Sequence, residues 1–185
     1  MAIVRTGNRS VLLVVDFQVG VVAGAWEASR IVGNVARAVE RARAQGAPVI
    51  WVQHEDDDRP RGSPQWQFVP ELVPAADELR IDKRYNSAFE ETTLEQELAR
   101  LGATRIVLAG AMTNWCIRSA AYAALERGYD LTLVKDAHTT SDLDMQNGTV
   151  RPAQGIVDDL NVAMNWVDYP GRVAKTATAA EVEFA

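Results

Sequence analysis

Val11-Leu12-Leu13-Val14-Val15 is a continuous apolar run that ends at the carboxylate of Asp16. A run of this length, without polar alternation, is typical of a parallel strand that is covered on both faces. Similar runs recur at 49–52, 105–110 and 131–134, with weaker ones at 79–83 and 173–178. Helical patterns separate most of them, so the sequence predicts an α/β fold of Rossmann-like topology. We expect a doubly wound, mainly parallel sheet with helices on both of its faces.

The helical patterns have recognisable ends. Apolar residues recur at helical spacing over 32–42, and this pattern stops at Gly46, which favours a left-handed helix end. A second helix is predicted to end at Gly102, a third runs from Trp115 to Gly128, and a last one begins with Pro152, a residue suited to the first helical position. The stretch 55–74 is rich in Pro, Gly and Asp, so it predicts a long loop. Loops of that length are usually functional or mobile.

Composition narrows the class of protein. The 185 residues are 48% apolar and 24% charged, which predicts one globular domain over 1–185. With 19 basic and 25 acidic residues the net charge is −6, which disfavours nucleic acid and anionic membranes as partners. No signal peptide and no run of roughly 20 apolar residues is present, so we expect a cytoplasmic protein. The single cysteine, Cys116, suits a reducing compartment.

Polar residues that directly follow the apolar runs are the candidates for chemistry, because ligands bind outside the carboxyl ends of the strands in such sheets. This rule selects Asp16, Lys83 and the turn that contains Cys116. Each has an ordinary alternative: a lone cysteine is often a small buried apolar residue, and Asp16 or Lys83 alone is typical of a loop or surface. Together they provide a carboxylate that accepts the thiol proton and an ammonium that stabilises a thiolate.

Cys116 lies in the first turn of the helix predicted from Trp115. Thr113 or Asn114 is its expected cap, and free backbone N–H groups with the helix dipole favour an anion there. We therefore expect a stabilised thiolate and a nucleophilic cysteine.

Three segments carry a resemblance to a known family: VVDFQ at 14–18, DKRYNSAF at 82–89 and GAMTNWCI at 110–117. Over about 11–134 the chain resembles the isochorismatase-like cysteine hydrolases, which include nicotinamidases and N-carbamoylsarcosine amidases. The resemblance implies that Asp16 is the general base, Lys83 the catalytic lysine and Cys116 the nucleophile. It also implies a cis peptide between Ala111 and Met112, and an oxyanion hole formed by the backbone N–H groups of Met112 and Cys116.

The implied function is cleavage of a carbon–nitrogen bond in a small amide, ureido or carbamoyl substrate through a thioester. We expect no cofactor, and the resemblance implies a homodimer or homotetramer, with apolar candidates at Val21, Val22, Trp26 and 166–170. The expected substrate-binding residues are Phe17, Gln18, Trp66, Tyr85 and Trp115. Gln18 and Asn86 could equally fasten the loops.

Other interpretations stay open. The chain has only two histidines, His54 and His138, whereas nicotinamidases carry a metal site with closely spaced histidines, so we expect no metal here. His138 follows a predicted strand and could pair with Cys116 as in papain-like enzymes. An ether hydrolase of the isochorismatase type and a noncatalytic small-molecule binding protein are the alternative functions.

Overall fold

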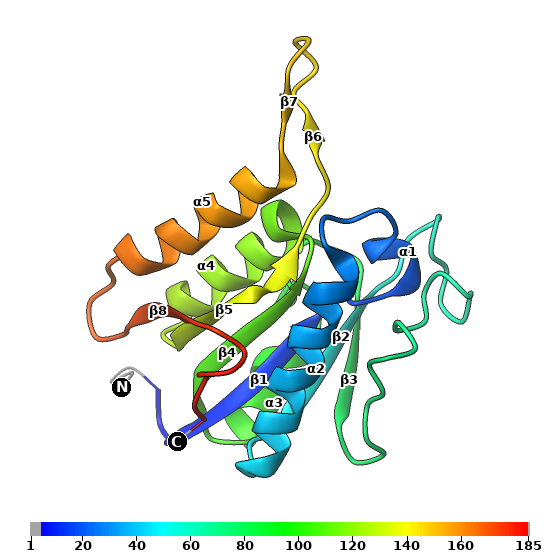
Figure 1. Ribbon diagram of the computed structural model, residues 1–185. Helices are drawn as coiled ribbons and strands as arrows, with labels where there is room; N and C mark the ends of the chain where they lie inside the picture. The colour runs from blue at the N-terminus through cyan, green and yellow to red at the C-terminus, as the bar shows by residue number, and fades with distance from the viewer. Residues whose placement is uncertain (1–4, 185) are drawn as a thin grey trace.

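Six parallel strands form the centre of the fold in the computed structural model, which describes residues 5–184. The strands lie side by side in the order β3-β2-β1-β4-β5-β8 (Figure 1). Their bounds are Arg9–Val15 for β1, Val49–His54 for β2, Leu79–Lys83 for β3, Ala103–Ala111 for β4, Asp130–Thr139 for β5 and Ala174–Ala177 for β8. All five pairs of neighbours are parallel, so the predicted parallel sheet is confirmed.

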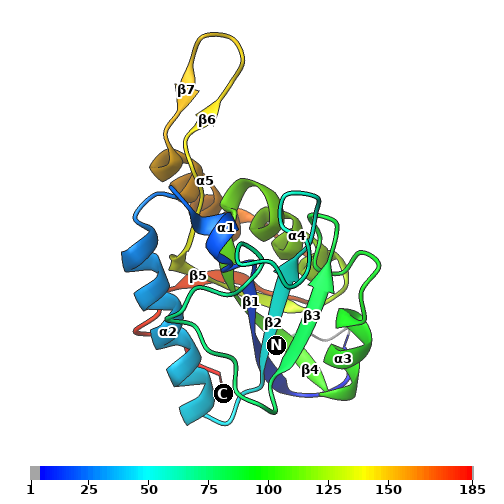
Figure 2. The same ribbon diagram turned by 90° about the vertical axis from the view of Figure 1, so that its right-hand side faces the viewer.

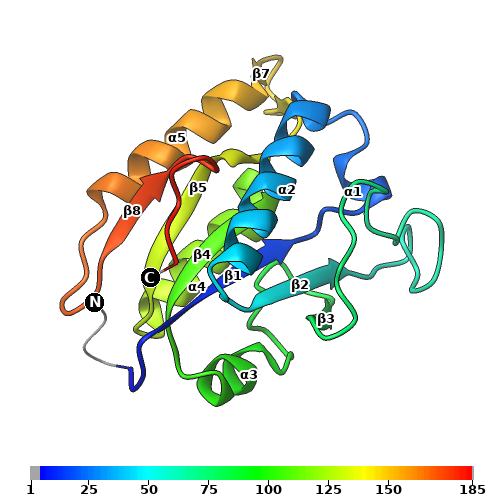
Figure 3. The same ribbon diagram turned by 60° about the horizontal axis from the view of Figure 1, so that its bottom comes forward.

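Helices cover both faces of this sheet, as the sequence predicts. Helix α2 (Ala28–Ala44) packs on one face, whereas α3 (Leu94–Arg100), α4 (Arg118–Glu126) and α5 (Ala153–Trp166) pack on the other (Figure 2). The chain after β8 returns to the α2 face, where the Arg41 guanidinium donates to the Val182 carbonyl (Figure 3). A short helix, α1 (Val19–Val22), follows β1.

Strand β1 shows why its sequence is apolar at every position. Leu12 and Val14 belong to the core beneath α2, whereas Val11, Leu13 and Val15 belong to the core on the opposite face. None of the five has any exposed surface. Burying a side chain of this kind contributes about 1.5–3 kcal/mol, so both faces of β1 stabilise the fold.

The strand order reverses between β1 and β4, and the crevice of a doubly wound sheet lies at such a point. Gly110 allows the two strands to approach closely there. Its φ is +152°, and a Cβ at this position would lie 2.3 Å from the Val15 carbonyl oxygen. A larger residue would push β4 away from β1, so this glycine sets the position of the chain that follows β4.

Two segments differ from the sequence expectation. A π-helical turn, Thr113–Ile117, precedes α4 where one regular helix is predicted from Trp115. A hairpin of β6 (Leu143–Asp144) and β7 (Val150–Arg151) projects from the body of the fold (Figure 1). Its strands are too short for their sequence pattern to stand out. Within residues 5–184, no helix has the length and apolarity that crossing a membrane requires.

Candidate active site

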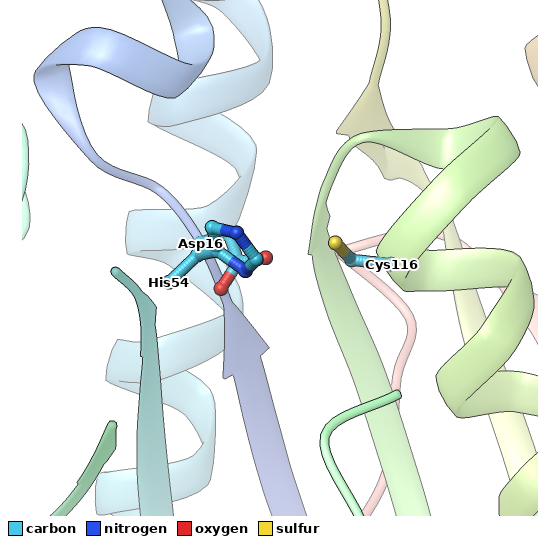
Figure 4. A group of neighbouring side chains, drawn as sticks. All are labelled: Asp16, His54 and Cys116. Carbon is cyan, nitrogen blue, oxygen red and sulfur yellow. The ribbon is translucent and has the colours of Figure 1, made fainter. Parts of the chain in front are cut away.

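Asp16, Lys83 and Cys116 meet at the carboxyl ends of the strands. Lys83 Nζ lies 2.7 Å from Asp16 Oδ2 and 3.2 Å from Cys116 Sγ. All three residues are buried, with exposed fractions of 1%, 2% and 8%. Figure 4 shows the sulfur of Cys116 pointing toward Asp16 at the end of β1. The structure thus brings together three residues that are 33 or more positions apart in sequence.

Asp16 leaves β1 in the left-handed region, with φ at +55°. Aspartate is one of the few residues other than glycine that tolerate this conformation. Its Oδ2 is paired with Lys83, whereas Oδ1 is buried and has no hydrogen-bond partner within residues 5–184. A buried carboxylate oxygen of this kind is a ready proton acceptor.

The Cys116 thiol differs from the expected thiolate. The pKa of the thiol is raised to about 12, chiefly by burial, and the negative charge of Asp16 adds more to this rise than the Lys83 ammonium removes. The resting residue is therefore a protonated thiol, and the expectation of a stabilised thiolate is wrong. The reason is that the carboxylate and the low polarity of the buried site outweigh one ammonium.

Thr113 and Asn114 do not cap the turn that carries Cys116. Met112 occupies the cap position and makes no side-chain cap. The Thr113 hydroxyl lies 2.9 Å from His138 Nδ1, and Asn114 Oδ1 accepts a hydrogen bond from the Thr140 hydroxyl. The expected cap is wrong because both side chains have tertiary partners on the chain around the end of β5.

His138 is fully buried and both of its ring nitrogens are engaged. Nε2 lies 3.0 Å from Asn161 Oδ1, and the amide of Asn161 donates to the Lys135 carbonyl, so Nε2 carries the proton and Nδ1 accepts from Thr113. Burial lowers the pKa of His138 to about 4. Neither nitrogen is free to pair with Cys116, so the papain-like arrangement is contradicted. His138 instead links β5 and α5 to the turn of the cysteine.

The buried neutral His138 is expected to make folding less stable in acid. Between pH 6.5 and about 4 the unfolded chain binds a proton at this histidine and the folded chain does not. The free energy of unfolding therefore falls by up to about 3 kcal/mol as pH drops through this window. Urea unfolding at several pH values measures this slope. The variant His138→Gln, which cannot titrate, is expected to show a shallower slope; an equal slope would contradict the assignment.

His54 joins the site from the end of β2. Its Nδ1 lies 3.0 Å from Lys83 Nζ, and its Nε2 lies 3.4 Å from Asp56 Oδ2. Burial lowers the pKa of His54, and the Lys83 ammonium lowers it further. His54 is therefore neutral and accepts a hydrogen bond from Lys83. From the sequence His54 is a candidate only for a metal ligand, although its place at a strand end is the signal that selects Asp16 and Lys83.

A cavity of about 230 Å³ opens beside Cys116. It is lined by Asp16, Val21, His54, Arg59, Asn86, Met112, Trp115 and Cys116. A larger hollow of about 780 Å³ lies over charged residues of the loop that follows β2, but it contains neither Asp16 nor Cys116. The smaller cavity is the candidate ligand site, because Asp16 and Cys116 line it. Its volume is below the roughly 300–1,000 Å³ of common ligand pockets, which favours a small substrate.

The comparison with known families agrees with this geometry. Residues 10–159 match the model of the isochorismatase domain. The chain belongs to the isochorismatase family.

Individual relatives support this assignment. A streptothricin hydrolase of Streptomyces noursei is 33% identical over 93% of the chain, which spans 66% of that relative's length. A probable inactive nicotinamidase of Arabidopsis thaliana is 32% identical over 76% of the chain and 89% of its own length. Among solved structures, an isochorismatase from Pseudomonas putida KT2440 is 30% identical, with a TM-score of 0.83, covering 94% of this chain and 90% of the other.

A metal site of the nicotinamidase kind does not suit this isochorismatase-family chain. Asp16, His54 and Cys116 offer ligand atoms within 4.8 Å of one another. However, Lys83 Nζ lies 2.7 Å from Asp16 Oδ2, 3.0 Å from His54 Nδ1 and 3.2 Å from Cys116 Sγ. The ammonium thus holds the position that a cation would take, and a metal ion would have to displace it.

Phe17 and Gln18, two of the expected substrate-binding residues, are outside the wall of the cavity. Phe17 is fully buried in the core beneath α2. Gln18 is also buried; its amide donates to the carbonyls of His54 and Trp66, and its oxygen accepts from the His54 N–H. Gln18 therefore fastens the loop after β2 to the end of β1, which is the alternative that the sequence left open.

The three remaining candidates are placed differently from one another. Trp115 is 50% exposed and lines the cavity. Trp66 is half-buried and outside the wall, and its carbonyl accepts from the amides of Gln18 and Gln53. Tyr85 lines a separate hollow, although its carbonyl accepts from Lys83 at 3.2 Å. The structure thus places only Trp115 of these three against the cavity.

Met112 lines the cavity as well, next to the turn that carries Cys116. The peptide bond between Ala111 and Met112 is cis, at the position that the family resemblance implies. The sequence does not single out Val21 and Arg59 as cavity residues, because Val21 is apolar and suggests a subunit contact, and Arg59 lies in a loop without a periodic pattern.

Proposed function

We propose that this isochorismatase-family protein is a cysteine-dependent hydrolase that cleaves the carbon–nitrogen bond of a small amide, ureido or carbamoyl substrate. The observation that carries the proposal is the contact of Lys83 with both Asp16 and Cys116, two residues that line a small cavity. A thiol, a carboxylate and an ammonium in contact form the set of groups that nucleophilic catalysis on an acyl carbon requires. A vinyl ether, as in isochorismate, needs no thiol, so the cysteine favours carbon–nitrogen cleavage.

In the first half of the proposed reaction, Cys116 Sγ attacks the carbonyl carbon. Because the pKa of the thiol is raised to about 12, proton transfer accompanies the attack, and the unpartnered Oδ1 of Asp16 receives the proton. Lys83 stabilises the negative charge on sulfur. Asp16 then passes the proton to the leaving nitrogen, the carbon–nitrogen bond breaks, and ammonia or an amine departs.

In the second half, water resolves the thioester. Asp16 removes a proton from the water, the oxygen attacks the acyl carbon, and the carbon–sulfur bond breaks. The proton returns to sulfur, so the resting thiol is restored together with an acid product. We assign the oxyanion hole to the backbone N–H groups of Met112 and Cys116, and such donors contribute about 3 kcal/mol each in comparable sites.

The proposal is tested with a panel of small amides, ureides and carbamoyl compounds, scored by release of ammonia. Hydrolysis of at least one class is expected, and rapid acid quenching followed by mass spectrometry should show an acyl group on Cys116. Cys116 is the only cysteine, so the site of acylation is unambiguous. Turnover without any acyl-enzyme and without dependence on Cys116 would contradict the proposal.

We also propose that the chain works without a cofactor, in the cytoplasm, as a homodimer or homotetramer. Trp166 is 82% exposed, and Val162, four positions earlier on α5, is exposed on the same side of the helix. An apolar pair of this kind suits a subunit contact, whereas Val22 is buried within its own chain. Light scattering is expected to give a mass of two or four chains, and Trp166→Glu is expected to lower it. A mass near 20 kDa for the native chain would contradict the assembly.

A further inference from the structure

Arg59 is a feature of the cavity that the proposed reaction leaves unused. It follows β2 in the loop 55–78, and it lines the cavity together with Asp16 and Cys116. Lys83 is not part of this wall, and His54 is neutral. Among the described residues that line the cavity, Arg59 is therefore the one full positive charge.

Contacts hold the guanidinium of Arg59 but leave one of its donors without an acceptor. Asp56 accepts a hydrogen bond from Nη2 and another, of 2.8 Å, from the backbone N–H of Arg59. The stem packs over Gly20, where an added Cβ would lie 3.2 Å from Arg59 Cδ. Nε is buried and has no hydrogen-bond partner in the described part of the chain. A buried guanidinium N–H without an acceptor is costly, so this donor suits an incoming oxygen.

Asp16, in the same cavity, has an acceptor oxygen without a hydrogen-bond donor among the described residues. Its Oδ1 is buried and lacks a donor, whereas Oδ2 is held by Lys83. The cavity therefore presents an acceptor beside Cys116 and a charged donor at Arg59. A molecule that satisfies both has an amide N–H at one end and a negatively charged oxygen at the other.

The charge of Arg59 and the size of the cavity limit which molecules fit. A carboxylate matches the planar guanidinium and gains a charge-assisted hydrogen bond from it. A neutral end would bind more weakly, and a cationic end would be repelled by Arg59. The cavity volume of about 230 Å³ leaves room for only a short chain between the two ends.

We propose that Arg59 binds a carboxylate of the substrate, so that the protein acts on short amides that carry a carboxylate away from the scissile bond. The inference rests on the proposed function, because it assigns the amide carbonyl to Cys116. In the bound state Nη2 stays with Asp56 and Nε donates to the substrate carboxylate. Arg59 is thus a specificity-determining residue.

The first test does not require that a substrate be hydrolysed. It compares two reagents that alkylate cysteine, iodoacetate, which carries a carboxylate, and iodoacetamide, which carries a neutral amide in its place. The ratio of their rates on Cys116, divided by the same ratio on glutathione, measures the preference for a carboxylate. We expect a corrected ratio of at least about 10 in the native protein. In Arg59→Gln the ratio is expected to fall to about 1. A ratio that is the same in both proteins overturns the proposal.

Arg61→Gln is the matched control, because Arg61 lies in the same loop, is exposed and pairs with Asp82 outside this cavity. It is expected to keep the ratio of the native protein. An equal loss in both arginine variants would mean that the general charge of the loop attracts the reagent, which also overturns the assignment to Arg59.

The second test compares hydrolysis of succinamate and succinamide, which differ in the same way. The native protein is expected to favour succinamate in kcat/KM by about tenfold or more, and Arg59→Gln is expected to lose this preference. Hydrolysis of neutral amides but of no carboxylate-bearing amide overturns the inference while leaving the proposed function intact. Hydrolysis that persists in Cys116→Ala instead contradicts the proposed function, so the two failures are distinguishable.

Discussion

Replacing Cys116 with alanine is expected to lower kcat for amide hydrolysis by about 10⁴-fold or more. The variant removes the atom that forms the thioester in the proposed reaction, and the remaining groups can only bind the substrate and polarise its carbonyl. Ammonia release from the best substrate of the panel measures the loss. The side chain is small and buried next to Lys83, so the fold is expected to persist.

Cys116→Ser is the matched control for this prediction. It keeps a hydrogen-bonding atom beside Lys83 while replacing the sulfur with a far weaker nucleophile. Circular dichroism and a thermal melt should show that both variants are folded. If either folded variant retains more than about a tenth of the native rate, Cys116 is not the nucleophile. The noncatalytic binding interpretation gains support if no compound in the panel is hydrolysed by the native chain.

Replacing Asp16 with asparagine is expected to change hydrolysis and thiol reactivity in opposite directions. Hydrolysis falls by about 10³-fold, because asparagine cannot carry the proton from sulfur to nitrogen. Alkylation of Cys116 by iodoacetamide at pH 8 rises by at least about tenfold. Burial still raises the pKa of the thiol in the variant, but the raising charge of Asp16 is gone and the lowering charge of the Lys83 ammonium remains, so the pKa falls.

Asparagine is also a suitable residue for the backbone at this position. It tolerates the left-handed conformation that Asp16 adopts at φ +55°, so the end of β1 is expected to keep its course. The thiolate that forms beside Lys83 replaces part of the lost ion pair.

Asp57→Asn, an exposed change in the loop after β2, serves as the charge-matched control and should alter neither measurement. If Asp16→Asn slows alkylation and hydrolysis together, Asp16 does not raise the thiol pKa, and the proton-transfer role assigned to it is wrong.

The local sequence was sufficient to predict the elements whose burial is uniform along the chain. Strand β1 is predicted by an apolar run, because both of its faces are covered and no position needs a polar residue. Gly46 and Gly128 mark the ends of α2 and α4, with φ of +68° and +87°, because glycine adopts this conformation without a steric penalty. These signals act within a few residues, and they therefore survive in the sequence pattern.

Other features depend on contacts between distant segments. In sequence, the π-helical turn at Thr113–Ile117 looks like the start of a regular helix. In the structure, the Thr113 hydroxyl contacts His138 and the Asn114 side-chain oxygen accepts from Thr140. The 55–78 loop has no periodicity that could show which of its side chains turns inward. Gln18 holds the two sides of Arg59, because its amide donates to the carbonyls of His54 and Trp66 and its oxygen accepts from the His54 N–H. Arg59 lies between these two residues in sequence and lines the cavity.

By itself, the sequence determined the parallel sheet with helices on both faces, and it selected Asp16, Lys83 and Cys116 through their places at strand ends. Only the tertiary structure decided that the pKa of the thiol is raised, that His54 contacts Lys83, and that Phe17 is core while Arg59 lines the cavity beside Cys116. The physical reason is that strand and helix patterns record local burial. A pKa and a cavity wall are instead set by charges and surfaces that meet only after the chain has folded.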